Sequence, residues 1–371
     1  MNDRAEKSVT LKSAWNVRGR AATSNGSGRF EQYSYEHHDD GWDIAEDETP
    51  LRTEVFEENA RHIITKNTSP DVPFDRSINA YRGCEHGCIY CFARPTHTYM
   101  GLSAGLDFES KLFAKPNAAE LLEKEIAREN YVPKPIAMGT NTDPYQPIER
   151  DREITRSILG VLNKYNHPCT ILTKSRLIVR DLDILAPMAE KGLVKAGLSV
   201  TTLDRKLSRT MEPRASMPQR RLDAIRLLSD AGVPTMAMFA PVIPALNDHE
   251  MEQVIAAVAH AGAKDVGYIL MRLPLELTDL FEEWLEANFP DRKERVMNRL
   301  KAMRGGKTND PRFKHRMMGK GAEADLMRVR FAALCRKHGL NKREDTFKLV
   351  TEAFQRPILK GSQYSLLDAL K

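Results

Sequence analysis

Three of the five cysteines in this 371-residue chain fall within eight residues, in the stretch NAYRGCEHGCIYCFARP that begins at Asn79. Cys84, Cys88 and Cys91 have the spacing C-x3-C-x2-C, so their thiolates can converge on one inorganic centre. A closed tetrahedral zinc site needs four ligands, whereas three thiolates can hold three irons of a [4Fe–4S] cube. The fourth iron of such a cube stays open to a small molecule. The spacing therefore favours a reactive iron–sulfur site over a closed structural one.

Two other interpretations of these cysteines stay open. A Cys3His zinc site could take His86 or His97 as its fourth ligand, although the chain has no second Cys/His pair at the usual zinc spacing. The other interpretation is a set of buried cysteines without a ligand, which fits poorly with a glycine-rich loop that carries charged residues. A disulfide framework is not expected, because the cysteine count is odd and we expect no secretory segment.

The composition is that of a globular protein, with 41% hydrophobic and 29% charged residues. No apolar run is long enough to span a bilayer, so we expect a cytoplasmic protein with no membrane partner. A reducing compartment also suits an oxygen-sensitive cluster. Residues 291–320 carry eleven Lys and Arg against three acids, about +8, and are the candidate surface for a polyanion. A solvated face with a flexible basic loop explains the same charges equally well.

The pattern divides the chain into three parts. Residues 1–50 have no sustained apolar period and are expected to form a disordered or flexible tail. Residues 51–272 alternate short apolar runs with amphipathic stretches, as in βαβ units around a parallel sheet. Residues 273–371 are expected to form a helical, basic extension, with helices at 280–287, 293–303 and 322–338. The expected strands are 77–81, 135–139, 169–173, 194–200, 235–239 and 265–271, and the expected core helices are 118–128, 151–165, 182–191, 218–231 and 250–261.

The cysteine spacing, with an aromatic residue just before the last cysteine, resembles the signature of the radical S-adenosylmethionine (SAM) superfamily. The longer stretch resembles the spore photoproduct lyase branch, also described as DNA-repair-photolyase-like, and the resemblance runs from about residue 70 to 340. The six β/α units fit the α/β fold of that superfamily, a partial (β/α)6 TIM-like barrel. The same units would permit an open doubly wound sheet, but the cysteine loop after the first strand favours the barrel.

The resemblance also implies cofactors and their contacts. Cys84, Cys88 and Cys91 would hold a [4Fe–4S] cluster, SAM would bind beside it, and a reductant such as flavodoxin or ferredoxin would be a partner. Ligands of β/α barrels gather where the strands end, and Lys174 is placed there to hold the SAM carboxylate. The further contacts implied by the resemblance are Gly139, Thr140 and Asn141 for the SAM amino group, Ser199 for the carboxylate, and Tyr90 near the adenine. Each of these residues could instead have only a structural role: Lys174 as a solvated lysine at a strand end, Ser199 as a strand hydroxyl and Tyr90 as a packing residue.

The activity implied is that of an enzyme that reductively cleaves SAM to a 5′-deoxyadenosyl radical, which abstracts hydrogen from an unreactive C–H bond. The leading expectation is a lyase-like enzyme acting on DNA, in repair, with residues 291–320 as its nucleic-acid contact. Modification of RNA, a peptide or a small molecule is an alternative from the same chemistry. A non-catalytic iron–sulfur redox sensor is an alternative of another class.

Two positions depart from the photoproduct lyases. Those enzymes carry a cysteine that returns a hydrogen atom to the product, and this chain has Thr140 there, whose hydroxyl is a poor hydrogen-atom donor. They have a tyrosine after the last cysteine, where this chain has Phe92. Cys169 begins a strand at the opposite end of the barrel, and Cys335 shares an apolar helical face, so neither is expected to replace the missing thiol. The sequence thus leaves the substrate, the hydrogen-atom donor, the electron donor and the fate of SAM open.

Overall fold

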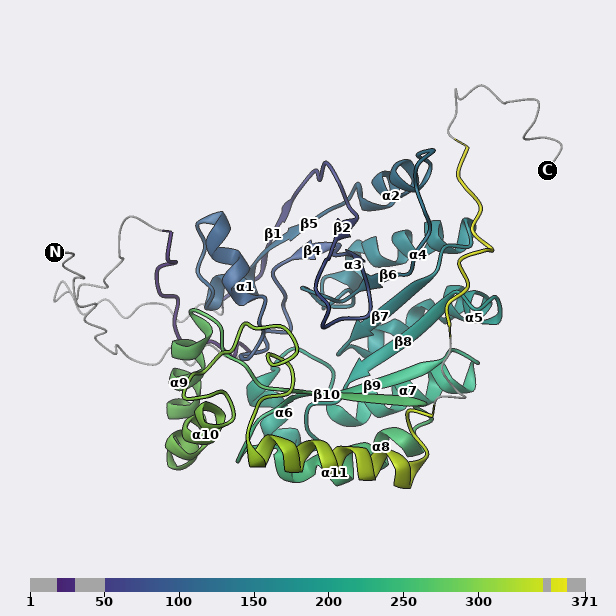
Figure 1. Ribbon diagram of the computed structural model, residues 1–371. Coiled ribbons are helices and arrows are strands. Elements are labelled where there is room, and N and C mark those ends of the chain that lie inside the picture. The colour runs from purple at the N-terminus through teal and green to yellow at the C-terminus, as the bar shows by residue number, and fades with distance from the viewer. Residues whose placement is uncertain (1–18, 31–50, 343–347, 359–371) are drawn as a thin grey trace, which may run out of the picture.

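The main sheet of the molecule has six parallel strands and one short antiparallel strand (Figure 1). This computed structural model describes residues 19–30, 51–342 and 348–358. The parallel strands are β3 (Arg76–Ile78), β6 (Ile136–Met138), β7 (Cys169–Thr173), β8 (Val194–Ser199), β9 (Thr235–Val242) and β10 (Asp265–Leu270). Each pairs with the next in this order, and β2 (Thr65–Lys66) pairs antiparallel with β3 at one edge.

The strands of the main sheet follow one another in the same order in the sheet as along the chain, with β4 and β5 of the second sheet between β3 and β6, so the six repeats wind in a single direction. A doubly wound sheet would instead reverse its strand order part-way along. In the described part of the chain β10 pairs with no strand besides β9, so the sheet is open at that edge. The expected α/β fold with a partial (β/α)6 barrel is therefore confirmed.

Amphipathic helices line the outside of this sheet (Figure 1). Their inward-facing residues, such as Leu122, Ile158 and Ile255, are fully buried in the main core. Burial of about 100 Å² or more of apolar side chain at each such position drives the packing of helix on sheet. The helices are α2 (Ala118–Ile126), α4 (Ile154–Lys164), α5 (Leu182–Glu190), α7 (Pro218–Asp230) and α8 (Met251–His260).

The first expected strand, 77–81, is in fact two short strands in two sheets. β3 ends at Ile78, and β4 (Tyr81–Arg82) joins a second sheet with β1 (Glu54–Glu57) and β5 (Lys111–Ala114). The interruption falls at Asn79, whose side-chain oxygen accepts the backbone N–H groups of Asn141 and Thr142 at 3.1 and 3.4 Å. Asn79 therefore turns toward the loop after β6, and the chain leaves the main sheet just before the cysteines.

The expected helix 151–165 is also divided, into α3 (Glu149–Arg152) and α4. The break is Glu153, which has a positive φ of 49°. The Glu149 carboxylate accepts the N–H groups of Thr155 and Arg156, at 3.0 and 3.3 Å, and so satisfies the first donors of α4. A carboxylate at a helix N-terminus also interacts favourably with the helix dipole.

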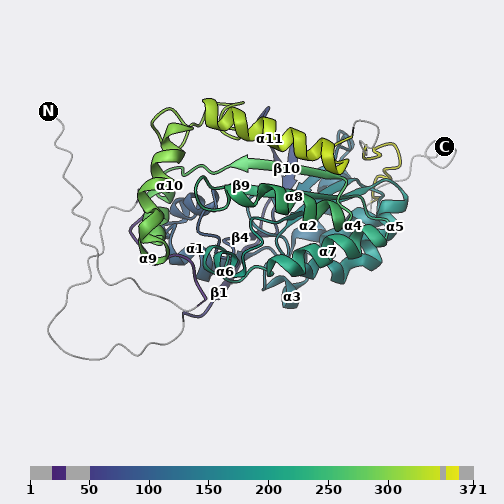
Figure 2. The same cartoon turned by 90° about the horizontal axis from the view of Figure 1, so that it is seen from below.

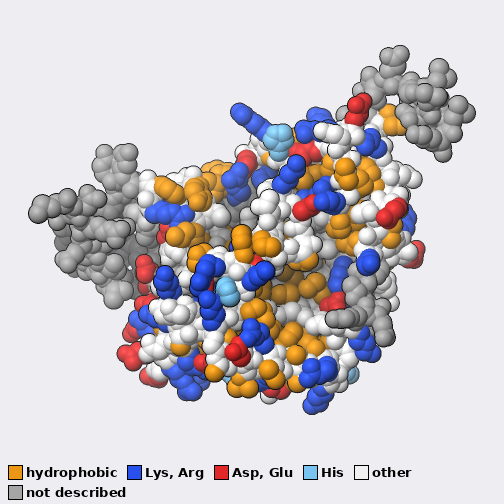
Figure 3. Space-filling model, viewed as in Figure 1, with side chains coloured by type: hydrophobic (Ala, Val, Ile, Leu, Met, Phe, Trp, Pro, Cys, Tyr) orange, Lys and Arg blue, Asp and Glu red, His pale blue; other side chains and the backbone are white. Residues whose placement is uncertain are grey.

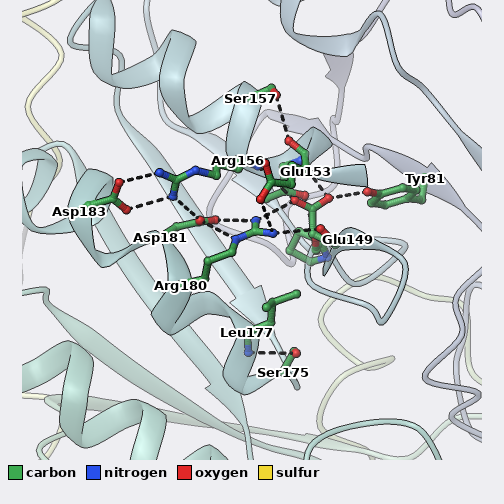
Figure 4. A network of polar contacts seen from close by, with 12 residues as sticks. Tyr81, Glu149, Glu153, Arg156, Ser157, Ser175, Leu177, Arg180, Asp181 and Asp183 are labelled. Carbon is green, nitrogen blue, oxygen red and sulfur yellow. Dashed lines mark hydrogen bonds and ion pairs between the residues drawn. The ribbon is translucent and has the colours of Figure 1, made fainter. Parts of the chain in front are cut away.

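Glu149 lies at the centre of a buried polar network (Figure 4). Its side chain has no solvent exposure, and it accepts hydrogen bonds from the Tyr81 hydroxyl and, at 3.0 Å, from Arg180. Arg180 also contacts the buried Asp181 at 2.8 Å, and Arg156 contacts the same carboxylate at 2.7 Å. The network ties β4, which precedes the cysteine loop, to the helices that follow β6 and β7.

Residues 19–30 differ from the flexible tail expected for 1–50. Arg20, Ala21 and Ala22 are buried, and the N–H groups of the two alanines donate to the Glu109 carboxylate at 3.1 and 2.9 Å. An extended segment held by backbone hydrogen bonds need not show an apolar period, which is why the pattern missed it. The remaining residues of this expected tail lie outside the described part of the chain.

The helices of the expected C-terminal extension are α9 (Leu277–Asn288), α10 (Pro290–Ala302) and α11 (Ala322–His338). Figures 1 and 2 show α11 alongside β10, where Phe331 packs on Tyr268 with ring centroids 4.6 Å apart. Arg304, after α10, donates to the carbonyls of Leu270 and Met271 at 2.7 Å each. The division into residues 51–272 and 273–371 remains a proposal. No helix among the described residues is both long and apolar enough to cross a membrane.

We predict that Glu149→Gln destabilises the protein by about 3 kcal/mol, because it removes one of the two buried carboxylates that hold the Arg180 guanidinium, the other being Asp181. Glu153→Gln is the matched control: its carboxylate is 55% exposed and lies 3.7 Å from Arg180, so we expect a change below about 0.5 kcal/mol. Urea unfolding followed by circular dichroism measures both. Equal midpoints for the two variants would contradict a structural role for the network.

Candidate active site

The cysteine loop begins after β4 and ends at the short 3-10 helix η1 (Arg94–Met100). Two tight turns shape it, with Gly87 N–H donating to the Cys84 carbonyl and Cys91 N–H to the Cys88 carbonyl, each at 3.1 Å. Gly87 has φ 64°, and a Cβ there would lie 2.6 Å from the Glu109 carboxylate. Cys84 and Cys88 are buried, and Cys91 is partly exposed. The three thiols thus belong to one loop whose backbone is closely packed.

Arg94 holds the backbone of this loop. Its side chain is fully buried, and its guanidinium donates to the carbonyls of Gly87 and Cys88 at 2.9 and 2.8 Å. It also contacts the fully buried Glu109, on α1 (Leu106–Ser110), at 2.5 Å. The remaining donors bind the carbonyls of Ala104 and Gly105, at 3.1 and 2.9 Å. All five N–H donors of Arg94 are therefore used inside the protein.

The loop after β6 contains the predicted contacts for the SAM amino group. Gly139 follows β6 with φ 87°, and a Cβ there would come within 1.9 Å of the Leu172 carbonyl on β7, so only glycine fits. The Thr140 hydroxyl lies within hydrogen-bond distance of both polar atoms of the Asn79 side chain, at 3.2 and 3.3 Å. Asn141 is exposed, with its N–H bound to Asn79. Asn79 therefore places this loop beside the strand that leads to the cysteines.

Asp143, in the same loop, connects it to β7 and to the cysteine loop. Its carboxylate accepts the Thr173 hydroxyl at 2.6 Å and the Lys174 N–H at 2.7 Å, and it lies 3.3 Å from Nδ1 of His86. Burial by itself raises the pKa of Asp143, but the His86 charge and these hydrogen bonds bring the pKa to about 2. The carboxylate is therefore ionised at neutral pH, and it fixes the backbone of Lys174 relative to Cys84 and Cys88.

Lys174 extends from the end of β7 toward the cysteine loop. Its ammonium nitrogen lies 5.7 Å from the centroid of the Tyr90 ring. Burial raises the pKa of the Cys88 thiol, and the nearby positive charge of Lys174 opposes that rise. Lys174 makes no side-chain hydrogen bond or ion pair with the described residues. Cys88 and Tyr90 are both predicted to contact a cofactor. An ammonium group beside them that has no ion pair with the described residues is suited to bind an anionic group.

Tyr90 is held by a second buried ion pair. Its hydroxyl donates to Glu212, which follows α6 (Arg205–Met211), and Glu212 also accepts the Thr201 hydroxyl at 2.8 Å. Arg221 pairs with Glu212 and donates to the carbonyl of Ser199, the last residue of β8, at 2.9 Å. This network fixes the backbone of Ser199 and the ring of Tyr90 with respect to each other.

The structure thus brings the predicted site residues to one end of the main sheet, where β6, β7 and β8 end and where the cysteine loop follows β4 of the second sheet. Cys169 lies apart from them, buried at the first position of β7, and burial raises its pKa to about 12. Cys335 is buried on α11. The pattern missed Asn79 and Asp143 as organising residues, although both are polar residues just after a strand, which is the signal that could have found them.

The histidines considered for a zinc site have other partners. Nε2 of His97 lies 2.9 Å from the Lys111 carbonyl, and His86 faces Asp143. Among the described residues, no three His, Cys, Asp or Glu side chains are placed to share a single metal ion. That finding concerns a mononuclear site, because each thiolate of a [4Fe–4S] cluster binds its own iron.

A model of the radical SAM superfamily matches residues 78–258, which are just under half of the chain. An uncharacterised protein of Mycobacterium tuberculosis (strain ATCC 25618 / H37Rv) is 37% identical over 222 residues, which are 59% of this chain and only 65% of that protein. An uncharacterised protein of Methanocaldococcus jannaschii is 27% identical over 248 residues, 67% of this chain and 88% of that protein. The names of these relatives give neither an activity nor a substrate.

Solved structures of spore photoproduct lyase are similar in fold. A mutant of that lyase with bound AdoMet and dinucleoside spore photoproduct matches with a TM-score of 0.55 and 16% identity. The lyase complexed with dinucleoside spore photoproduct matches with a TM-score of 0.54 and 15% identity. Each match covers 77% of this chain and 80% of the other. At this level of identity the similarity establishes the fold.

The cofactors of the radical SAM family are a [4Fe–4S] cluster and SAM. The residues present fit these groups. Three cysteine thiols supply the soft ligands that iron–sulfur clusters require, and the unpaired Lys174 ammonium beside Cys88 and Tyr90 suits a carboxylate.

We predict that Asp143→Ala weakens SAM binding by about 10-fold, because the N–H of Lys174 and the hydroxyl of Thr173 lose their acceptor and Lys174 is released. SAM affinity of the reconstituted protein is measured by equilibrium dialysis, beside its iron content. Asp151→Asn, on the exposed part of α3, is the control and should bind SAM as the wild type does. Wild-type affinity in Asp143→Ala would exclude this positioning role.

Proposed function

We propose that this protein is a radical SAM enzyme that acts on a nucleic acid, with DNA as the leading candidate. The observation that carries the proposal is the place of the basic loop between α10 and α11, residues 303–321. Its Met317 carbonyl accepts the Leu270 N–H at 2.9 Å, and its Thr308 carbonyl accepts the Leu273 N–H at 3.1 Å. The loop therefore lies where β10 ends, at the same end of the sheet as the cysteines, and Lys and Arg gather over it (Figure 3).

The charge available to a polyanion is smaller than the count for residues 291–320 suggests. Lys293 and Arg299 pair with Glu286 and Asp248, at 3.0 and 3.1 Å. Arg304 is buried against backbone carbonyls. Arg312 and Arg316 pair with Asp310 and Asp71, at 2.7 and 2.5 Å. Six cations have no ion pair with the described residues and support a nucleic-acid contact: Arg292, Arg295, Lys301, Lys307, Lys314 and Lys320.

We propose the following cofactor-binding roles for residues of this chain. Cys84, Cys88 and Cys91 would hold the cluster, Lys174 and Ser199 would bind the SAM carboxylate, and Tyr90 would lie near the adenine. The loop from Gly139 to Asn141 would contact the SAM amino group. When bound, these cofactors supply a 5′-deoxyadenosyl radical, which is the chemistry of the family. The surrounding burial would exclude water from that chemistry.

The photoproduct lyases use a cysteine thiol as a hydrogen-atom donor, and we propose that this protein has no equivalent thiol. All five cysteines lie in the described residues, and outside the cysteine loop the thiols are Cys169 and Cys335, both away from the strand ends. Thr140, at the expected donor position, is bound to Asn79. We therefore propose a reaction in which no protein thiol outside the cysteine loop returns a hydrogen atom to the product. The substrate would then differ from the lesion that those lyases bind.

We predict that Lys174→Met lowers SAM affinity by 10- to 100-fold, while Lys174→Arg keeps much of it, because the lost interaction is a charge-assisted contact. Binding is measured on anaerobically reconstituted protein with matched iron content. Equal affinities for Lys174→Met and wild type would exclude Lys174 as the carboxylate partner.

A test of the reaction compares 5′-deoxyadenosine formation by reduced holoprotein with no addition, with undamaged duplex and with ultraviolet-irradiated DNA. We expect stimulation by irradiated DNA and none of the product from Cys88→Ala, which should also lose the visible colour of a cluster. Stimulation by RNA or a peptide and not by DNA would refute the proposed substrate class. Complete absence of 5′-deoxyadenosine in the wild type would favour a redox sensor.

A further inference from the structure

Arg272 is a cation whose hydrogen-bonding groups are unused. It follows β10 at the end of the sheet where the cysteine loop lies, and its side chain is partly buried. Its guanidinium makes no hydrogen bond or ion pair with the described residues, in contrast to Arg304 and Arg316 nearby. Burial lowers the pKa of Arg272, and the neighbouring Arg316 charge lowers it further. A half-buried guanidinium with free N–H groups is suited to receive an anion from outside the protein.

Phe92 places an aromatic ring directly beside this cation. It follows Cys91, it is 46% exposed, and the Arg272 guanidinium carbon lies 5.2 Å from the centroid of its ring. An exposed phenyl ring presents a flat apolar face on which a nucleotide base can stack. The pair thus offers a positive charge and a flat apolar surface next to a proposed cluster ligand.

A second pair of the same kind continues the surface onto the basic loop. Phe313 is 52% exposed, and the Arg316 guanidinium carbon lies 4.9 Å from its ring centroid. Arg316 is held by Asp71 at 2.5 Å, so its position is fixed. Arg304 donates to the carbonyls of Met271, next to Arg272, and of Arg316, at 2.7 and 3.1 Å, so the two pairs are neighbours. Aromatic rings and guanidinium groups therefore alternate from Phe92 at the cysteine loop to Phe313 near Lys314.

We infer that Arg272 and Phe92 form a nucleotide subsite, in which the guanidinium binds a phosphate and the exposed ring stacks on an unpaired base. The inference rests on the proposed function and specifies its substrate as a single-stranded or flipped-out nucleotide. A base inside a duplex cannot stack on a protein ring, whereas an unpaired base presents its whole face. The guanidinium fork matches two phosphate oxygens. Phe313 then offers a second stacking surface for the adjoining nucleotide.

The test measures binding of a fluorescently labelled single strand of about 12 nucleotides to anaerobically reconstituted holoprotein, at several salt concentrations. Arg272→Gln should lower the affinity by about 10-fold and reduce the slope of log affinity against log salt by about 0.7, the value for one phosphate contact on a single strand. Phe92→Leu should lower the affinity by about 5- to 100-fold with an unchanged slope, because stacking releases no counterions.

Two matched variants serve as controls. Phe92→Tyr keeps a stacking ring and should bind within about 3-fold of wild type. Arg336→Gln removes an exposed cation on α11 and should change neither affinity nor slope. Iron content and visible absorbance are compared for every variant, and Arg272→Gln still decides the question if Phe92→Leu loses its cluster.

Wild-type affinity and slope in Arg272→Gln would overturn the subsite, while binding by the wild type would leave the proposed substrate class standing. No binding by the wild-type holoprotein would overturn both. Effective competition by free thymidine monophosphate, lost in Arg272→Gln, would support the subsite and assign it to a free nucleotide instead of a strand.

Discussion

The buried ion pair between Arg94 and Glu109 is the interaction on which the candidate site depends. It satisfies carbonyls on both sides of Cys88 and, through Glu109, the N–H groups of Ala21 and Ala22. The attraction within a buried ion pair offsets the desolvation of its charges only when nearly every donor and acceptor is hydrogen-bonded. Here all five N–H donors of Arg94 are hydrogen-bonded. The consequence is that Arg94 and Glu109 hold the backbone of the cysteine loop in place.

The rest of the site is assembled by polar side chains that each join two strand ends. Asn79 holds the loop after β6, Asp143 joins that loop to β7 and to His86, and Glu212 joins Tyr90 to Arg221 and β8. Glu212 is buried and Asn79 and Asp143 are partly buried, so the loss of a hydrogen-bond partner would be costly at each. The candidate cofactor contacts are therefore pre-organised as a set, which radical chemistry requires because a reactive group must meet one C–H bond and no other.

Whether a charged side chain is available to a ligand depends on the tertiary structure and not only on the local sequence. The count for residues 291–320 predicted a broad basic surface, yet several of those cations are bound to acids that come from distant positions, such as Asp71 and Asp248. Arg272 lies outside that block, beside Phe92 of the cysteine loop, and its guanidinium pairs with no acid among the described residues. A charge count cannot distinguish these cases, because ion pairing depends on which segments meet in space.

The sequence by itself determined the cysteine triad, the order of six β/α units and nearly all of their boundaries, because spacing and apolar period are properties of local segments. It also placed Lys174 and Ser199 at strand ends, where a parallel sheet must gather its ligands. Only the tertiary structure decided that β3 and β4 part at Asn79, that residues 19–30 pack on Glu109, and that Phe92 meets Arg272. Each of these depends on contacts between segments far apart in the chain, and such contacts leave no periodic signal in the residues that make them.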